Sequence, residues 1–297
     1  MESSGNRSFR AACFGESFWY GSGNRFYPVG FPVILSFYLH HTGMDPVLVT
    51  RVGLDEQGKK IIRFMEEKDL CTDCFQIDYN DPTGKWPDNG AKGPAYAPLQ
   101  AWNNIVAEPA CISKFQNADI WVHSSMPAYY PGSASLQTML SIIELNIKRV
   151  FYLTLQGSVI SKTVLEQCLK GAFILHTGVE ELELITGWFS NMTSLTDRVN
   201  ILHQQFGIPY IIISTEKSGY FISAEGNTYR HEKQNGKGSS GSFADHVFLA
   251  GLIPSILNEH DIPKAIAAGA QLKELVAASG ALYPAGAAPL LNQYGGG

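Results

Sequence analysis

The chain has 297 residues, of which 45% are hydrophobic and 16% are charged, and its formal net charge is −5. This composition supports a large buried core, and the slight acidic excess argues against a nucleic-acid partner, which usually requires a basic stripe. No apolar run reaches the roughly 20 residues of a membrane span, and the first ten residues lack the apolar stretch of a secretory signal, so we expect a cytoplasmic globular protein with no membrane partner.

The first third of the chain alternates short apolar runs with longer helical patterns. Alternating β-branched residues indicate strands, and a 3.6-residue apolar period indicates helices. We expect strands over 11–15, 46–52 and 75–77, and helices over 33–41 and 55–68. Residues 78–108 are rich in Pro, Gly, Asn and aromatic residues, and we expect them to form strands and loops outside the main core.

From residue 118 onward, strand and helix patterns alternate regularly. This alternation predicts βαβ units, a mostly parallel central sheet and helices on both faces. We expect strands over 118–125, 150–155, 172–176 and 210–214, a hairpin over 219–223 and 228–231, and helices over 133–146, 162–169, 179–186, 195–206, 248–257 and 262–278. Because no clean linker interrupts the pattern, we expect a single α/β domain over 10–290 with a small β appendage.

Five cysteines are scattered along the chain: Cys13, Cys71, Cys74, Cys111 and Cys168. An odd number at irregular spacing does not suit a disulfide framework. Cys71 and Cys74 form a C-x-x-C motif, but a zinc site needs a second pair of ligands, and a redox motif is expected at a strand-to-helix turn. This motif follows a helical pattern instead, so we predict ordinary thiols.

A loop rich in glycine and serine, residues 236–246, precedes the helix expected over 248–257. Such a loop offers backbone N–H groups and the helix dipole to an anion, although it does not match the P-loop pattern G-x₄-G-K-[ST]. Ligands of open α/β sheets bind beyond the carboxyl ends of the strands, near helix N-termini. Asp245 can cap the helix, so a capped loop without a ligand is the alternative to an anion site.

Around this loop, the order of elements is similar to that of the PfkB-type, or ribokinase-like, carbohydrate kinases, and most similar to fructokinases. The resemblance covers about residues 10–290. It rests on CFGESFW (13–19), the turn 29–32, VTRVGLDEQGKKIIRFMEEKDLCTD (49–73), PTGK (82–85), PAYAPLQAWNNI (94–105), VEELELITG (179–187) and VFLAGLI (247–253). It implies a ribokinase-like three-layer α/β sandwich with a small β lid to which residues 17–35 and 78–108 contribute.

Kinases of this family transfer the γ-phosphoryl group of ATP, with Mg²⁺, to a sugar hydroxyl. An aspartate at the start of the late helix acts as base, and backbone amides stabilise the transferred charge. The resemblance also implies a homodimer formed through the lid. The implied site residues are Asp245 or His246 for catalysis, Ser214, Gly219, Gly241 and Ser242 for the nucleotide, Gly30 and Trp102 for the sugar, and Glu181 for the metal.

Several positions of the implied site differ from the family's pattern. An ungapped match places residues 243–246 on the family's Gly-Ala-Gly-Asp loop, so His246 rather than Asp245 takes the position of the base. A one-residue shift turns a helical side chain by about 100°, and Phe243 would crowd an anion site that needs bare backbone. The other replacements are Tyr20 for an aspartate, Val29 and Ile34 in the sugar loop, Tyr152, Thr154 and Gln156 for Asp-x-Asn-x-Arg, Gly178 for an asparagine, Glu216 for a glycine, and Lys273 and Glu274 for a Gly-Ala pair.

These departures fall on polar site positions, whereas the framework segments are kept, and they leave several interpretations open. The first is a sugar-kinase-like protein with lost or very weak catalysis and with binding of ATP and Mg²⁺ weakened or lost. The second is an active sugar kinase that uses His246 or Asp245 as base. The third is a non-catalytic binding protein that uses the lid, where Tyr96 and Trp102 either form a subunit interface or pack internally. A local misalignment that hides an ordinary active site is the remaining alternative.

Overall fold

A computed structural model of the protein describes residues 8–22, 25–86, 99–155, 160–189, 191–215, 219–224, 226–232 and 243–284. The strands of its central sheet are β1 (Arg10–Phe14), β4 (Asp45–Gly53), β5 (Phe75–Asp78), β7 (Ile120–Ser124), β8 (Lys148–Leu153), β9 (Ile174–Gly178), β10 (Tyr210–Ser214), β11 (Tyr220–Ala224) and β12 (Asn227–His231). They form a nine-stranded sheet in the order β12-β11-β10-β9-β8-β7-β1-β4-β5. The strands from β10 to β5 are parallel, and β11 and β12 continue the sheet antiparallel.

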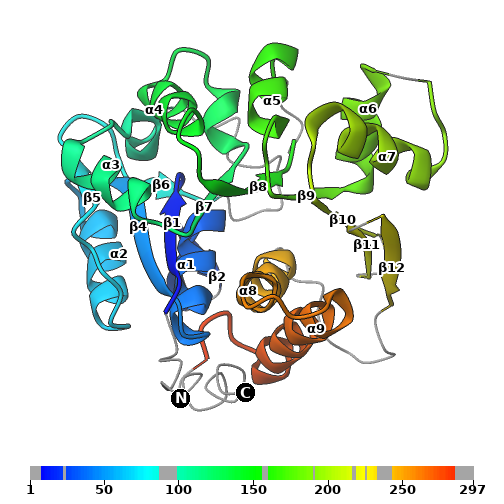
Figure 1. Ribbon diagram of the computed structural model, residues 1–297. Coiled ribbons are helices and arrows are strands. Elements are labelled where there is room, and N and C mark those ends of the chain that lie inside the picture. The colour runs from blue at the N-terminus through cyan, green and yellow to red at the C-terminus, as the bar shows by residue number, and fades with distance from the viewer. Residues whose placement is uncertain are drawn as a thin grey trace, which may run out of the picture.

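Helices cover both faces of this sheet, which gives a three-layer α/β sandwich (Figure 1). One face carries α1 (Phe31–His41), α2 (Glu56–Glu66), α8 (Ala244–Leu257) and α9 (Ile262–Ser279), and the other carries α3 (Pro109–Gln116), α4 (Ala134–Ile143), α5 (Lys162–Leu169), α6 (Val179–Gly187) and α7 (Leu195–Phe206). Right-handed crossovers keep successive helices on one face until the direction of winding reverses. That reversal occurs after β5, so α3 begins the second layer. In the described part of the chain, no helix is both long and apolar enough to cross a membrane.

Side-chain caps define the starts of several helices, but α8 starts without one. Asp55, Ser133, Ser161, Ser194 and Asp261 accept hydrogen bonds from backbone amides at the starts of α2, α4, α5, α7 and α9. The N-cap of α8 is Phe243, which makes no such bond, and the helix begins at Ala244 rather than at the expected residue 248. Asp245 and His246 therefore lie in the first turn of α8.

Two glycines allow α8 and α9 to pack closely. A Cβ atom at Gly251 would lie 2.7 Å from the carbonyl oxygen of Ala268, and one at Gly269 would lie 2.7 Å from the carbonyl oxygen of Phe248. Larger residues at these two positions would force the helices apart. The close contact fixes the direction of α8 and hence the place of its first turn at the sheet.

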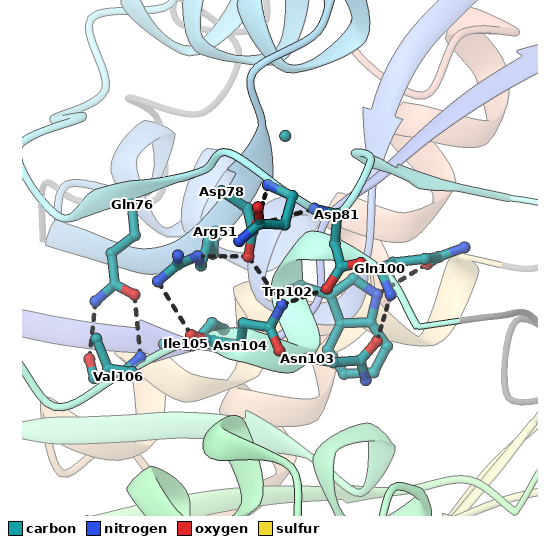
Figure 2. A network of polar contacts seen from close by, with 12 residues as sticks. Arg51, Gln76, Asp78, Asp81, Gln100, Trp102, Asn103, Asn104, Ile105 and Val106 are labelled. Atoms are coloured by element: carbon teal, nitrogen blue, oxygen red, sulfur yellow. Dashed lines mark hydrogen bonds and ion pairs between the residues drawn. The ribbon is translucent and has the colours of Figure 1, made fainter.

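A second, small sheet lies outside the central one. It contains β2 (Phe18–Ser22), β3 (Arg25–Val29) and β6 (Gly84–Lys85) in the order β3-β2-β6. The chain returns from this small sheet through a short 3₁₀ helix, Ala101–Asn104. The Asn104 side chain donates hydrogen bonds to Asp78 (2.8 Å) and Asp81 (2.7 Å), and Arg51 pairs with Asp78 at 2.9 Å. Figure 2 shows how this network attaches the returning segment to β4 and β5.

Candidate active site

The carboxyl ends of the parallel strands and the first turns of α1 and α8 meet at one edge of the central sheet. The strand register places Tyr152 of β8 between Ser124 of β7 and His176 of β9. The ring of His246, on α8, lies 5.0 Å from that of Tyr152 and 5.1 Å from that of Phe31, on α1. This edge is where open α/β sheets bind ligands, so it is the candidate active site.

Aromatic side chains from β2, α1, β8, the start of α8 and the residue that follows β6 pack together at this edge. We call Tyr20, Phe31, Trp86, Tyr152, Phe243 and His246 the aromatic cluster. Phe31 and Tyr152 stack with centroids 4.6 Å apart. Phe243 makes edge contacts with Tyr20 at 6.0 Å and with Trp86 at 5.5 Å. The cluster therefore joins the small sheet to the first turn of α8 through apolar contacts.

His246 is enclosed by this cluster. It is 5% exposed, and its ring contacts those of Phe31, Tyr152 and Phe243. Burial lowers the pKa of His246 to about 3, because the charged imidazolium loses its hydration. Its Nδ1 atom has no hydrogen-bond partner among the described residues. The side chain is neutral at pH 7 and is a weak base there.

Asp245 faces a different set of groups, at the ends of β10 and β11. Its carboxylate accepts hydrogen bonds from the hydroxyls of Ser214 and Tyr220, each at 2.8 Å. Ser214 also lies 2.7 Å from Nε2 of His176, and the Lys273 ammonium donates to the Tyr220 hydroxyl at 2.9 Å. We call these five residues the Asp245 network. It joins α8 and α9 to three strands of the sheet.

The Asp245 network holds a carboxylate in its charged form. Burial acts to raise the pKa of Asp245, but the neighbouring His176, the hydrogen bonds from Ser214 and Tyr220, and the Lys273 charge together lower it. The Asp245 charge in turn raises the pKa of Tyr220, as burial does. The Lys273 ammonium lies 4.6 Å from the centroid of the Tyr220 ring, which also stacks on Phe248 at 3.8 Å. The carboxylate is thus paired within the protein.

Gly30, predicted to contact a sugar, begins α1 in a conformation that favours glycine. Its φ is +131°, and a Cβ atom there would collide with the carbonyl oxygen of Glu16. The next amide, that of Phe31, donates to Oε1 of Glu16 at 3.1 Å, and the Ser124 hydroxyl donates to Oε2 at 2.7 Å. Glu16 is 2% exposed, and burial raises its pKa to about 7. The first amide of α1 is therefore occupied by a carboxylate of the same chain.

Glu181, the predicted metal ligand, lies in the first turn of α6. Its Oε1 atom accepts a hydrogen bond from the Leu155 amide at 3.3 Å, and its other oxygen lies against Gly178. Within the ranges that the structure describes, no group of three or more His, Cys, Asp or Glu side chains could hold a metal ion. Mg²⁺ is usually held by one or two carboxylates together with substrate phosphates. Of the predicted metal ligands, the structure therefore places Glu181 at this edge, where one of its oxygens accepts a hydrogen bond from the Leu155 amide.

The other predicted site residues divide into three groups. Ser214 is brought next to Asp245 as part of the Asp245 network, and Gly219 directly precedes β11, where its carbonyl accepts a hydrogen bond from the Thr215 amide at 3.0 Å. Trp102 is fully buried against Phe18 and Tyr130, and its Nε1 donates to Gln100 (Figure 2), so it presents no surface to a sugar. Gly241 and Ser242 lie outside the described residues, as do Tyr96, Gln156 and Glu216.

Among the residues of this edge that were not predicted from the sequence are three titratable ones: Glu16, His176 and Tyr220. Glu16 lies directly after the first strand, in the segment CFGESFW, and an acid there is a signal that could have been used. His176 lies in the middle of β9 and Tyr220 begins β11, and Asp245, to which both are linked, is distant in sequence. No local pattern marks that contact.

Comparisons with known proteins identify the class of this fold and site. Residues 20–283 match the pfkB family of carbohydrate kinases. Because this match covers most of the chain, the protein belongs to the pfkB family, and its sandwich is ribokinase-like. A search of curated proteins returned no match.

Solved structures of kinases share the fold over nearly the whole chain. Aminoimidazole riboside kinase from Salmonella enterica, solved with aminoimidazole riboside and an ATP analogue, has 13% identity and a TM-score of 0.75, covering 97% of this chain and 100% of its own. Fructokinase from Vibrio cholerae, solved with fructose, ADP and calcium ion, has 14% identity and a TM-score of 0.73, covering 96% and 98%. Fructokinase from Xylella fastidiosa with bound ATP has 14% identity and a TM-score of 0.72, covering 96% and 97%.

Proposed function

We propose that this member of the pfkB family is a sugar-kinase-like protein whose phosphoryl-transfer activity is lost or very weak. The observation that carries the proposal is the first turn of α8. His246, which aligns with the base, is buried in the aromatic cluster with a pKa of about 3. Asp245, its neighbour, is paired with Ser214 and Tyr220. Neither side chain is arranged to take a proton from a sugar.

The chemistry of a general base supports this reading. A base must lie within hydrogen-bond reach of the hydroxyl that it deprotonates, with a pKa near the working pH, and it contributes roughly 10²–10⁴-fold to the rate. Phe31, Tyr152 and Phe243 surround His246, and its Nδ1 atom has no hydrogen-bond partner among the described residues. Asp245 accepts one hydrogen bond on each carboxylate oxygen, and these bonds favour its charged form, which makes it a weaker base.

The sugar positions support the same conclusion. Where the resemblance implies polar residues, the chain has Tyr20, Ile34 and Tyr152; Ile34 is fully buried, and the two tyrosine rings belong to the aromatic cluster. A sugar hydroxyl that is buried without a hydrogen-bond partner costs about 1–3 kcal/mol. Several such losses would weaken sugar binding severely.

The described residues do not fit ATP and Mg²⁺ in the way that the family implies. At the position of the family's Gly-Ala pair, Lys273 instead extends over the Tyr220 ring, which stacks on Phe248. Glu181 is the one predicted metal ligand among these residues, and it is engaged with the Leu155 amide. We therefore derive no catalytic step through the nucleotide.

The test is a coupled assay of ADP release with ATP, Mg²⁺ and a panel of sugars that includes fructose and ribose. We expect no sugar-dependent release above that of the protein-free control, and the same result for His246→Ala and Asp245→Asn. We also expect that His246→Asp alone restores nothing, because Phe243 remains in place. Sugar-dependent turnover that either of the first two variants abolishes would overturn the proposal and establish an active kinase with that residue as base.

The small sheet supports a second candidate function, association with another copy of the chain. The Phe26 side chain of β3 is 58% exposed, and Trp19 of β2 stacks on it at 6.2 Å. Exposed apolar side chains in one place mark interaction sites. Sedimentation velocity of the protein and of Phe26→Glu tests this candidate: a dimer that the variant dissociates supports it, and a monomer in both cases refutes it.

A further inference from the structure

Three cysteines lie close together in two segments of the chain, one between α2 and β5 and the other in α3. Cys71 and Cys74 precede β5, and Cys111 lies in α3. The thiols of Cys74 and Cys111 are within hydrogen-bonding reach of each other. Both are free, and each residue is 2% exposed. The contact is a product of the fold, and the C-x-x-C spacing does not reveal it.

Neighbouring hydrogen bonds hold the two segments side by side. The Gln76 side chain donates to the Val106 carbonyl at 2.8 Å and accepts from the Val106 amide at 3.0 Å. Figure 2 shows this reciprocal pair next to the hydrogen bonds that join Arg51, Asp78 and Asn104. The approach of Cys74 to Cys111 is therefore supported by contacts that do not involve the thiols.

A lysine one turn along α3 supplies a positive charge. Lys114 Nζ lies 3.8 Å from Cys71 Sγ and 3.0 Å from Asp73 Oδ2. The hydrogen bond from Cys111 and the charge of Lys114 lower the pKa of Cys74, against the effect of burial. The side chains of Lys114 and Asp73 are 32% and 74% exposed, and Cys71 is partly exposed, so the groups that flank the two buried thiols reach the surface.

We propose that Cys74 and Cys111 form a reversible redox pair, which a peroxide converts into a disulfide. The Cys74 thiolate attacks one peroxide oxygen and the O–O bond breaks. Cys74 becomes a sulfenic acid, and the other oxygen leaves as an alcohol or water with the proton that the thiol released. The Cys111 sulfur then attacks the Cys74 sulfur, so that the S–S bond forms, the S–O bond breaks and water leaves with the Cys111 proton. A dithiol reductant reverses the oxidation by thiol–disulfide exchange.

The disulfide would close residues 74–111 into a loop that contains β5, β6 and the 3₁₀ helix Ala101–Asn104. Oxidation would thus link α3 covalently to the chain segment that leads through β5 to the small sheet. A cross-link of this kind stabilises the folded state by restricting the unfolded chain. None of these cysteines belongs to the aromatic cluster or the Asp245 network, so the inference does not depend on the loss of catalysis.

The test treats the native protein with hydrogen peroxide, blocks the remaining thiols and digests it with trypsin without reduction. Cleavage after Lys68, Lys85, Lys92 and Lys114 places Cys71 and Cys74 in peptide 69–85 and Cys111 in peptide 93–114. We expect these peptides to be linked within one chain and to separate on reduction. The link should persist in Cys71→Ser and in the control Cys168→Ser, and be absent in Cys111→Ser. Lys114→Gln should slow its formation by about threefold or more, because less Cys74 is ionised.

The thermal midpoint provides a second readout that does not require a variant to fold identically. Oxidation of the unmutated protein should raise the Tm by about 5 °C, and reduction should restore it. The proposal is overturned if both thiols stay free at peroxide concentrations that link them after unfolding. It is overturned equally if the product is a Cys71–Cys74 disulfide, seen as peptide 69–85 alone and lighter by two hydrogens.

Discussion

Replacing Asp245 with alanine tests whether its carboxylate stabilises the folded protein or is kept for catalysis at the expense of stability. The Asp245 network gives this carboxylate two hydrogen bonds at 2.8 Å, from Ser214 and Tyr220, and Lys273 completes it through Tyr220 at 2.9 Å. A hydrogen bond to a charged group contributes about 1.5–3 kcal/mol, and removing the acceptor leaves the donors unpaired. Asp245 and Lys273 keep some solvent contact, so we take the lower end and expect Asp245→Ala to reduce the free energy of unfolding by about 3 kcal/mol.

The assay is urea unfolding at pH 7, followed by circular dichroism, with a thermal scan beside it. For a chain of 297 residues, an unfolding entropy of about 2.1 cal/mol/K per residue corresponds to roughly 1.6 °C per kcal/mol, so the Tm should fall by about 5 °C. The matched control is Glu180→Ala, which removes an exposed acid from the first turn of α6 and should cost about 0.5 kcal/mol. A carboxylate kept for catalysis often costs stability. If Asp245→Ala is as stable as the unmutated protein or more stable, the reasoning is refuted.

Two further predictions concern the start of α1. Because the folded-state pKa of Glu16 is raised from 4.5 to about 7, its contribution to stability is complete below pH 4.5 and is lost as the pH rises through 7. Between pH 5 and pH 8 this loss amounts to about 2.5 kcal/mol. Urea unfolding across that range should show the loss, and Glu16→Gln should lack it; parallel pH profiles of the two proteins would contradict the assignment. Gly30→Ala, at φ +131° against Glu16, should cost at least about 2 kcal/mol, whereas Gly43→Ala, at φ +89° with nothing within 4 Å, should cost about 1 kcal/mol. Equal losses of unfolding free energy in the two variants would show that a Cβ atom at position 30 does not collide with Glu16.

The sequence predicted the layers of the fold well because its patterns are local. The regular alternation from residue 118 defines strands and helices whose bounds differ from the structure by only a few residues, and the helix over 195–206 agrees fully. The start of α8 was placed too late, because its N-cap is Phe243, which makes no side-chain cap, whereas Asp245, the residue expected to cap the helix, lies inside its first turn. Helix α3 was not predicted, because no side-chain cap marks its start, whereas Ser161 caps the equally short α5, which was predicted over 162–169.

The site was predictable only in part, because its contacts join distant segments. The resemblance identified Tyr20, Tyr152, Phe243 and His246 as unusual residues one by one. That their rings pack against one another depends on the strand register and on the entry of α8, which no local pattern encodes. The same holds for the contact between Cys74 and Cys111, which the sequence analysis placed among ordinary thiols.

The most direct test of the central claim is a calorimetric titration of the protein with ATP in the presence of Mg²⁺. The aromatic cluster and the Asp245 network occupy the edge where a kinase would hold its substrates. We therefore expect no binding heat up to millimolar nucleotide, with a fructokinase as positive control. Saturable binding of one ATP per chain at micromolar concentration would contradict the account.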